Sequence, residues 1–355
     1  MIIWAWIDAL FFWIMGIILL LHTIKWWNNP VKGNVRNSEI VESIIFFIIG
    51  YYILTMVSES SEISNILYLV HIISFSALII FFWGFNVLPN YIKSKKNPEY
   101  RNENTYEKFL EKIDDKYNSV ELGTKKDRFK DFSRKLLHFM QFIGIISFHF
   151  ISESIVKNNS DWNVSFIEFR NFIYFLVAGF FWIMMMVGDM TRITHWEYLP
   201  RWGWRWFEKS LEPEKERWTV NGATTILLAN MIWIHPVFPI QVLIITAWVS
   251  CIGDAVASIV GKYFGNHKMT IGNFPQKSFE GLIAGVLTTV IGTIGLLKLF
   301  PVLGLSNFIL ILIALVCGII FALVDMFSKL ICDNLLNGIF TGAVTWILIL
   351  IFTTG

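Results

Sequence analysis

Charged residues are scarce in this sequence: they make up 16% of its 355 residues, whereas hydrophobic residues make up 55%. A soluble globular domain carries about 25% charged residues, so this chain has too little polar surface to stay in water. The composition excludes an ordinary soluble protein and predicts an integral membrane protein that crosses the bilayer several times. The net charge is only +2, and this balance gives no sign of a nucleic-acid partner.

Cysteine is rare as well, with three residues in the chain. They lie in apolar stretches, and an odd number without metal-ligand spacing disfavours both a disulfide framework and a zinc site. The sequence also lacks the Gly-x-x-x-x-Gly-Lys-Ser/Thr loop and the protein-kinase motif set, so a bound nucleotide would be held in another way. The apolar N-terminus, residues 1–24, has no basic segment and no small-residue cleavage site. We therefore expect a retained membrane span there rather than a signal peptide.

Long apolar runs, by contrast, are numerous. About 20 mostly apolar residues are enough to cross a bilayer as a helix, and the sequence contains about ten such runs. We therefore expect an all-α fold, a polytopic integral membrane helical bundle of about ten transmembrane helices. Residues 222–253 are too long for one helix and contain Pro236 and Pro239, which predicts a helical hairpin there. The expected spans are residues 3–24, 40–56, 66–88, 136–156, 166–187, 223–234, 237–253, 282–300, 308–330 and 335–352.

The lysine and arginine residues are concentrated in a few of the segments between these spans. Residues 93–135 hold 13 of the 29, and the cytoplasmic loops of membrane proteins carry the excess of positive charge. With that stretch in the cytoplasm, alternation of ten spans places 26 of the 29 inside and both termini outside. The predicted parts are a three-span N-terminal region (residues 1–89), a charged cytoplasmic linker with a surface helix (90–133), and a seven-span catalytic membrane domain (134–355).

Four polar strings occur near span ends in the second half of the chain, where an unpartnered charge would be costly. Alternation of the spans brings them to the cytoplasmic face, and acids gathered there with cations suggest a site for a metal and phosphates. Taken singly, each string has a simpler explanation: Arg134 can snorkel to the interface, and small residues such as Gly261 and Gly265 can serve helix packing. The strings contain Arg134, Lys135 and His138; Gly253, Asp254, Gly261, Lys262 and Gly265; Lys277, Ser278, Glu280 and Gly281; and Asp325, Asp333 and Asn334.

The residue types in these strings indicate particular roles. A carboxylate such as Asp254 can hold Mg²⁺ through one or two oxygens alongside substrate phosphates. Lys277 offers a point charge for a phosphate, and Ser278 is placed to cap the following helix, whose N-terminal amides favour anions. Asp325 lies within a span, where an ionisable residue is by default a functional candidate. Clustering of Asp254, Lys277 and Asp333 at one membrane face would favour an enzyme site, whereas a path along the midplane would favour a transporter.

Together, these strings resemble the membrane family of dolichol kinase, phytol kinase and the CTP-dependent diacylglycerol kinase of yeast type. That family shows R-K-x-x-H, an acidic residue before a G-A pair, G-D-A-x-A-x-x-x-G-x-x-x-G, K-S-x-E-G and D-N in this order. The resemblance covers about residues 134–352 and leaves the first three spans unexplained. The chain departs from it at Asp325, where the family often has Glu, and in lacking the proline that often follows D-N. The matching residues are Arg134, Lys135 and His138; Glu212 or Glu216 before Gly222 and Ala223; Gly253, Asp254, Ala255, Ala257, Gly261 and Gly265; Lys277, Ser278, Glu280 and Gly281; and Asp333 with Asn334.

The resemblance implies a membrane lipid kinase that uses Mg²⁺ and takes CTP, or another nucleoside triphosphate, as phosphoryl donor. The acceptor would be the hydroxyl of a lipid alcohol in the bilayer, such as dolichol, phytol or diacylglycerol. Catalytic roles are implied for Asp254, Lys277 and Asp333, with the two aspartates also serving as metal ligands. The implied nucleotide- and phosphate-binding residues are Arg134, Lys135, His138, Gly253, Gly261, Lys262, Gly265, Ser278, Glu280, Gly281 and Asn334.

Two other functions fit part of the pattern. The related phosphatidate cytidylyltransferases, which make CDP-lipids, share similar glycine and lysine strings. They also carry a long C-terminal signature with K-D, H-G-G and D-R-x-D, which residues 325–338 lack, and this difference favours phosphoryl transfer. A membrane transporter is the second alternative, which predicts inverted repeats and broken helices in both halves of the chain. The sequence shows only the one interruption at Pro236 and Pro239.

Overall fold

The protein is a bundle of helices. The computed structural model describes residues 2–25, 36–57, 62–118, 125–162, 164–210, 216, 219–269, 277–328 and 331–354. Within these ranges every regular element is helical, apart from one isolated antiparallel bridge between Lys268 and Ser278. Nine of the described helices are long and apolar enough to cross a membrane, and the shorter apolar helix at Gly222–Ile234 is the tenth apolar run. The predicted all-α polytopic bundle is confirmed.

The helices follow the predicted order. The N-terminal region forms α1 (Ile2–Lys25), α2 (Arg36–Val57) and a continuous helix made of α3 (Glu62–Ile79), the π-helical η2 (Ile80–Val87) and α4 (Leu88–Lys96). The linker forms α5 (Pro98–Glu103) and α6 (Tyr106–Asn118). The remainder forms α7 (Lys125–Asn158), α8 (Phe166–Thr194), α9 (Arg201–Ser210), α11 (Gly222–Met231), α12 (Ile240–Ala247), the π-helical η6 (Trp248–Gly253), α13 (Asp254–Phe264), α14 (Phe279–Leu299), α15 (Asn307–Phe327) and α16 (Asp333–Thr354), with short 3-10 turns η3 (Ser160–Trp162), η4 (Trp196–Tyr198) and η5 (Ile232–Ile234).

The predicted hairpin between α11 and α12 is present, because the chain turns after Ile234 and Pro239 precedes the first residue of α12. Three spans extend past their expected ends, and two of them run to Lys96 and Thr194 instead of ending at residues 88 and 187. The helix that was expected to end at Gly253 continues through η6 into α13 and spans Ile240–Phe264. Proline-free sequence and a run of small residues allow this continuation. Asp254 therefore lies within one continuous helix formed by α12, η6 and α13 rather than at the end of that helix.

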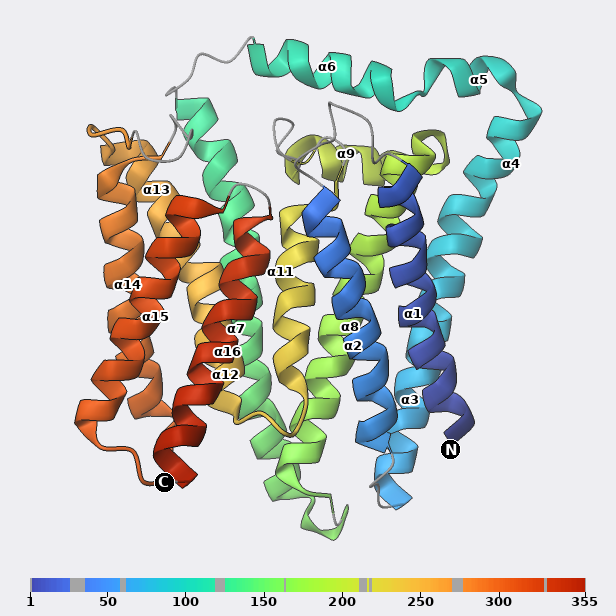
Figure 1. The fold of residues 1–355 in the computed structure, drawn as a ribbon. Coiled ribbons are helices and arrows are strands. Elements are labelled where there is room, and N and C mark those ends of the chain that lie inside the picture. Colours follow the sequence, from blue (N-terminus) through green and yellow to red (C-terminus); the bar gives the residue numbers. More distant parts are fainter. Residues whose placement is uncertain are drawn as a thin grey trace.

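The two ends of the bundle differ in what covers them. Both chain termini lie at one end, and the linker helices α5 and α6 lie across the other (Figure 1). We call these the terminal end and the linker end. This is the relative arrangement that ten alternating spans require.

The three N-terminal helices pack directly against the rest of the bundle. The ring of Trp182 in α8 stacks on Phe12 of α1 with centroids 5.0 Å apart, and lies 4.9 Å from the ring of Phe46 in α2. All three residues are fully buried and belong to one continuous core. Lipid is as apolar as these rings, so close packing rather than exclusion of water holds the helices together.

The linker helix α6 docks on the linker end through aromatic side chains. Phe109 stacks on Trp196 with ring centroids 4.0 Å apart, and the Tyr106 hydroxyl accepts a 2.6 Å hydrogen bond from the Arg192 guanidinium. Arg192 is completely buried and forms an ion pair with Asp189, one helical turn earlier on α8. The predicted surface helix is thus present and is fixed to the bundle at its N-terminal turn.

Candidate functional site

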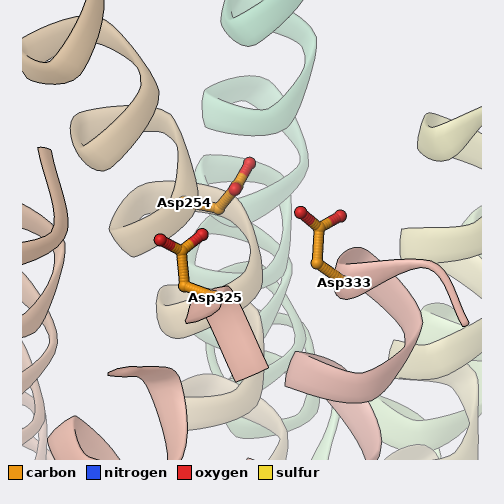
Figure 2. Close-up of side chains that lie close together, drawn as sticks. All are labelled: Asp254, Asp325 and Asp333. Atoms are coloured by element: carbon orange, nitrogen blue, oxygen red, sulfur yellow. The ribbon is translucent and has the colours of Figure 1, made fainter. Parts of the chain in front are cut away.

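Three aspartates from three helices converge toward the linker end. Asp254 is the first residue of α13, Asp325 lies in the last turn of α15, and Asp333 is the first residue of α16. Each contributes a carboxylate oxygen to a group in which all three oxygens lie within 4.8 Å of one another. Figure 2 shows the three side chains projecting into a common region. We call this group the aspartate triad.

The local sequence explains how these side chains come together. Asp254 follows directly after η6, and π-helical turns inside α-helices are frequent at functional sites because they re-aim the next side chain. Asp325 and Asp333 flank the short connection between α15 and α16, so one loop brings both carboxylates to the same end of the bundle. The predicted clustering of Asp254, Lys277 and Asp333 is what the structure has.

Two lysines partly neutralise the triad. The Nζ of Lys277 donates to Asp325 Oδ1 at 2.6 Å and to the Asp325 carbonyl at 2.7 Å, and it lies 3.5 Å from Asp333 Oδ2. Lys135 of α7 forms a buried ion pair with Asp254. Burial opposes the charge of Lys277, but the carboxylates of Asp333 and Asp325 outweigh it and raise the pKa of the lysine above its ordinary value. Lys277 therefore stays charged at neutral pH.

Three helices begin at the same end as the triad. The Ser278 hydroxyl accepts from the backbone N–H of Gly281 and caps α14, as predicted. The Asn221 side chain caps α11 by accepting from the N–H of Ala223 at 2.9 Å, and α16 begins with Asp333 itself. Helix N-termini carry free N–H groups and partial positive charge, which favour bound anions. This end of the bundle thus suits both a cation at the triad and phosphates beside it.

The glycines of the predicted site lie where α13 and α14 touch. A Cβ on Gly281 would come within 2.6 Å of the Ala257 carbonyl oxygen and 2.9 Å of the Gly261 Cα. A Cβ on Gly265 would meet the Gly261 carbonyl and the Ser278 side chain, and one on Gly253 would lie 2.8 Å from Thr289 Oγ1. Helix packing therefore accounts for these small residues. Their contact with a nucleotide stays a prediction.

The remaining predicted residues surround the triad at different depths. His138 is buried on α7, one turn after Lys135 and on the same face. Glu280 holds the loop before α14, because it accepts from the His267 backbone N–H at 3.1 Å and contacts the ring Nδ1 at 2.5 Å. Lys262 is exposed on α13.

A Cβ on Gly222 would lie 2.8 Å from the Asn334 amide nitrogen, so Asn334 reaches the start of α11. Arg134 is part of α7, but its side chain lies outside the described part of the chain, as does Glu212.

The other predicted acidic residue, Glu216, organises the segment before α11. Its carboxylate accepts from the Gly222 backbone N–H at 2.7 Å and from the Asn221 amide at 3.3 Å. Arg192 donates to the carbonyls of Glu216 and Thr219 in the same segment. Glu216 is therefore bound to the first residues of α11.

Sequence reasoning missed the contribution of α2 to this end. The Ser38 hydroxyl accepts a 2.8 Å hydrogen bond from the backbone N–H of Cys332, the residue before Asp333. Glu42 is buried and accepts from the Thr225 hydroxyl of α11 at 2.9 Å. Glu42 lies within a predicted span, and an ionisable residue there is a signal that could have found it. The first three helices thus help to position the residues of the last seven.

The donor set of the triad fits a hard divalent cation. Carboxylate oxygens are the ligands that Mg²⁺ prefers, commonly one or two per ion together with substrate phosphates and water. Three aspartates against two lysines leave one net negative charge in the group, which a divalent cation would reverse. The site would then carry a net positive charge and would attract a polyphosphate.

Comparison with known proteins gives one match. A family model described as the cytidylyltransferase family matches residues 131–331, which is more than half of the chain. The match begins just before Lys135 and ends just before Asp333, and it includes Asp254, Lys277 and Asp325. No curated protein and no solved structure matches the chain.

Proposed function

The chain belongs to the cytidylyltransferase family, and on that premise we propose that it is a membrane lipid kinase. In this proposal it transfers the γ-phosphoryl group of CTP to the hydroxyl of a lipid alcohol, such as a polyprenol, phytol or diacylglycerol. The observation that carries the proposal is the aspartate triad, bridged by Lys277 and backed by Lys135. The family resemblance found in the sequence supports CTP as the donor.

Phosphoryl transfer requires positioning and neutralisation of charge more than covalent chemistry. Asp254 and Asp333 would hold Mg²⁺, which when bound neutralises charge on the phosphates. Lys277 would provide a fixed positive charge for the transferred group, held in place by its two bonds to Asp325. Lys135 would keep the Asp254 carboxylate oriented, and the N-termini of α14 and α16 would offer backbone N–H groups to the phosphates.

Asp333 is the carboxylate best placed to meet the lipid hydroxyl. Its side chain is 27% exposed, compared with 12% for Asp254 and 10% for Asp325. The hydroxyl oxygen would form a new bond to the γ-phosphorus, and the bond from that phosphorus to the oxygen bridging the β-phosphate would break. CDP leaves, and the Asp333 carboxylate accepts the proton of the hydroxyl. The lipid would reach the site from within the bilayer at the linker end, which we place in the cytoplasm.

The family itself favours a second candidate, cytidylyl transfer to a lipid phosphate. There a phosphate oxygen of the lipid attacks the α-phosphorus of CTP, and pyrophosphate leaves. The triad suits this reaction as well, because both reactions place a triphosphate beside carboxylates and lysines. The absence of the K-D, H-G-G and D-R-x-D signature from residues 325–338 is the reason for preferring the kinase.

The test uses CTP labelled separately at the α and γ phosphates. Purified protein in detergent with Mg²⁺ is given lipid alcohols, diacylglycerol and phosphatidic acid in parallel. Transfer of γ label to an alcohol, with release of CDP, is the expected result and identifies the acceptor class. Transfer of α label to phosphatidic acid, with release of pyrophosphate, would replace the kinase by the second candidate. No transfer of either label would contradict both.

Two variants make the test specific. Asp254→Asn removes a triad carboxylate at nearly constant volume and should abolish transfer. Glu153→Gln changes an exposed carboxylate at the terminal end, where Glu153 pairs with Lys157 at 2.7 Å, and should leave transfer unchanged. Equal loss in both variants would mean that the assay reports general damage rather than the triad.

A further inference from the structure

A second polar group lies at the terminal end, between α7 and α8. It consists of His149 and Ser152 of α7 with Arg170 and Asn171 of α8, and each of these residues is at most 8% exposed. Arg170 is the fifth residue of α8, so it lies about 6 Å along the helix axis from the helix start. Arg170 therefore lies near the end of the candidate span Phe166–Thr194 rather than at its middle.

The four side chains occupy facing surfaces of the two helices. The Tyr174 hydroxyl of α8 donates a 2.7 Å hydrogen bond to the Ile145 carbonyl of α7. His149 follows Ile145 by one turn, and Arg170 precedes Tyr174 by one turn, so both lie on the contact side. The Phe166 ring lies against both residues, with its centroid 5.3 Å from the His149 ring and 5.5 Å from the Arg170 guanidinium carbon.

Hydrogen-bond donors exceed acceptors in this group. Arg170 donates through Nε and one Nη to a single acceptor, Asn171 Oδ1, at 3.1 and 2.9 Å. Within the described ranges no carboxylate forms an ion pair with Arg170, and the nearby Glu153 is engaged by Lys157. His149 Nδ1, Ser152 Oγ and Asn171 Nδ2 are buried and make no hydrogen bond there.

Such a group is costly unless something supplies acceptors. A buried cation with one neutral amide as its only acceptor, beside three buried polar atoms with none, leaves several desolvated groups uncompensated. The missing partner must be anionic and must have several acceptor oxygens. A phosphate group has both properties, and the planar guanidinium matches its geometry with paired N–H groups.

We propose that His149, Ser152, Arg170 and Asn171 bind the phosphate group of a phospholipid in the leaflet at the terminal end. The rings of Phe150, Phe166 and Phe300 surround His149 and provide an apolar wall for the glycerol backbone and the acyl chains. His149 follows Lys135, the partner of Asp254, by 14 residues on α7, so the site lies about 21 Å along the helix axis from the aspartate triad. It is therefore a lipid site distinct from the proposed reaction and does not depend on it.

The experiment measures lipid binding by native mass spectrometry of the full chain in detergent. The probes are phosphatidylglycerol and, with the same acyl chains, triacylglycerol, which lacks both the phosphate and the hydroxyl required of an acceptor. The intact protein should retain phosphatidylglycerol in preference to triacylglycerol, and Arg170→Gln should weaken phosphatidylglycerol binding by about tenfold or more, because a charge-assisted bond to phosphate is lost. Lys298→Gln, which removes an exposed cation in the last turn of α14, serves as the matched control and should bind as the parent does.

Three results would overturn the proposal. Equal binding of phosphatidylglycerol to the parent and to Arg170→Gln would show that Arg170 does not contact the phosphate. Equal loss in Lys298→Gln would mean that the effect reports surface charge rather than the site. Displacement of phosphatidylglycerol from the parent by excess inorganic phosphate would mean that the group binds free phosphate rather than a lipid.

A second pair of variants keeps the test valid if Arg170→Gln does not fold. Ser152→Ala and His149→Phe each remove a polar group without hydrogen bonds in the described structure, so both proteins should elute as the parent does in size-exclusion chromatography. Each should weaken phosphatidylglycerol binding by about threefold, as expected for one lost neutral hydrogen bond. Unchanged binding in both variants would also contradict the proposal.

Discussion

The two ends of the bundle hold polar groups of opposite sign. At the linker end, three aspartates face two lysines, and the group has one net negative charge. At the terminal end, Arg170 has no carboxylate partner among the described residues, and its neighbours are neutral donors. The first group is suited to a cation and the second to an anion. The linker-end group keeps a net negative charge, and three polar atoms of the terminal-end group make no hydrogen bond within the described residues. Both features are expected where a ligand binds rather than in a purely structural network.

The contrast also extends to how each group is supported. At the linker end the side chains are bound from several helices: α2 through Ser38, α7 through Lys135 and the loop before α14 through Lys277. At the terminal end the group is confined to α7 and α8, with Phe300 packed beside it. A reaction centre requires fixed positions from many elements, whereas a headgroup site tolerates a looser frame.

The largest expected effect is at Asp254. Asp254→Asn should lower the rate of transfer about 10³-fold, because a metal-binding carboxylate contributes about 4 kcal/mol to the barrier at that ratio. The same change leaves Lys135 buried without its partner, which costs about 3–5 kcal/mol of folding stability. Initial rates with γ-labelled CTP and thermal unfolding in detergent measure the two effects.

A double variant separates catalysis from stability at this pair. Lys135→Met combined with Asp254→Asn removes both buried charges and should recover most of the lost stability, while transfer stays low. Binding of phosphatidylglycerol at the terminal end should stay within about twofold of the parent in both variants. Loss of phosphatidylglycerol binding together with transfer would show that the two ends are coupled and do not act as separate sites.

Lys277 should give the next largest effect. Lys277→Met should lower kcat/KM for CTP about 100-fold, since it removes the charge that faces the transferred phosphate and leaves Asp325 without its donor. Lys277→Arg keeps the charge and should retain part of the activity. Steady-state rates over a range of CTP concentrations measure both variants. A Met variant as active as the Arg variant would show that the positive charge of Lys277 does not contribute to transfer.

The raised pKa of Lys277 gives a pH test. The carboxylates of Asp333 and Asp325 raise that pKa in the folded protein, so the charged lysine stabilises the fold at every pH below the ordinary lysine value of about 10.4. The stabilisation is lost only as the pH rises through the raised value. The difference in unfolding temperature between the parent and Lys277→Met should therefore be constant from pH 7 to about pH 10. A parent that gains stability relative to Lys277→Met as the pH rises from 7 to about 10 would mean that the pKa is lowered instead.

Sequence predicted most of the fold because span length and apolar composition are strong local signals. The ten runs, the break at Pro236 and Pro239 and the Ser278 cap are all found. The end of the span at Gly253 was wrong, since the polar Asp254 resembles a boundary when read without its partner. The structure gives that carboxylate a buried lysine, and the helix continues.

The candidate site was predicted in part. Each aspartate of the triad stood out as an ionisable residue near an apolar run. Sequence placed Arg134 and His138 together on one face, but the described contact of that segment with the triad is made by Lys135. Ser38 is 294 residues from its partner Cys332 in the chain, and no local sequence pattern predicts a contact over that separation. Arg170 belongs to no motif, and its interpretation depends on the lack of a carboxylate partner among the described residues.

Ser38 offers a smaller effect that sharpens the role of the N-terminal helices. Ser38→Ala removes the acceptor of the Cys332 N–H and should lower kcat about fivefold, equivalent to about 1 kcal/mol. KM for CTP should change less, because the loss concerns the position of Asp333 rather than a contact with the nucleotide. Rates at saturating and limiting CTP separate the two parameters.

The controls for this prediction come from the same helix. Ser38→Thr keeps the hydroxyl and should restore the rate. Ser43→Ala removes a buried hydroxyl that donates to the carbonyl of Glu39 in its own helix, and should leave kcat unchanged. Equal losses at Ser38 and Ser43 would point to general loosening of α2 and would remove Ser38 from the positioning of the triad.

The smallest expected effect concerns α6, which lies across the linker end (Figure 1). Tyr106→Phe removes the hydroxyl that accepts from Arg192, while the ring keeps its contacts with Phe109 and Trp196. One lost hydrogen bond of about 1 kcal/mol should accelerate amide hydrogen exchange in α6 about fivefold. Tyr100→Phe in α5 is the matched control, because Lys93 lies over the face of the Tyr100 ring. Amide exchange in α6 should not change in this variant. Equal exchange of α6 in Tyr106→Phe and the parent would mean that aromatic stacking alone fixes this helix, and that the buried Arg192 serves only Asp189 and the segment before α11.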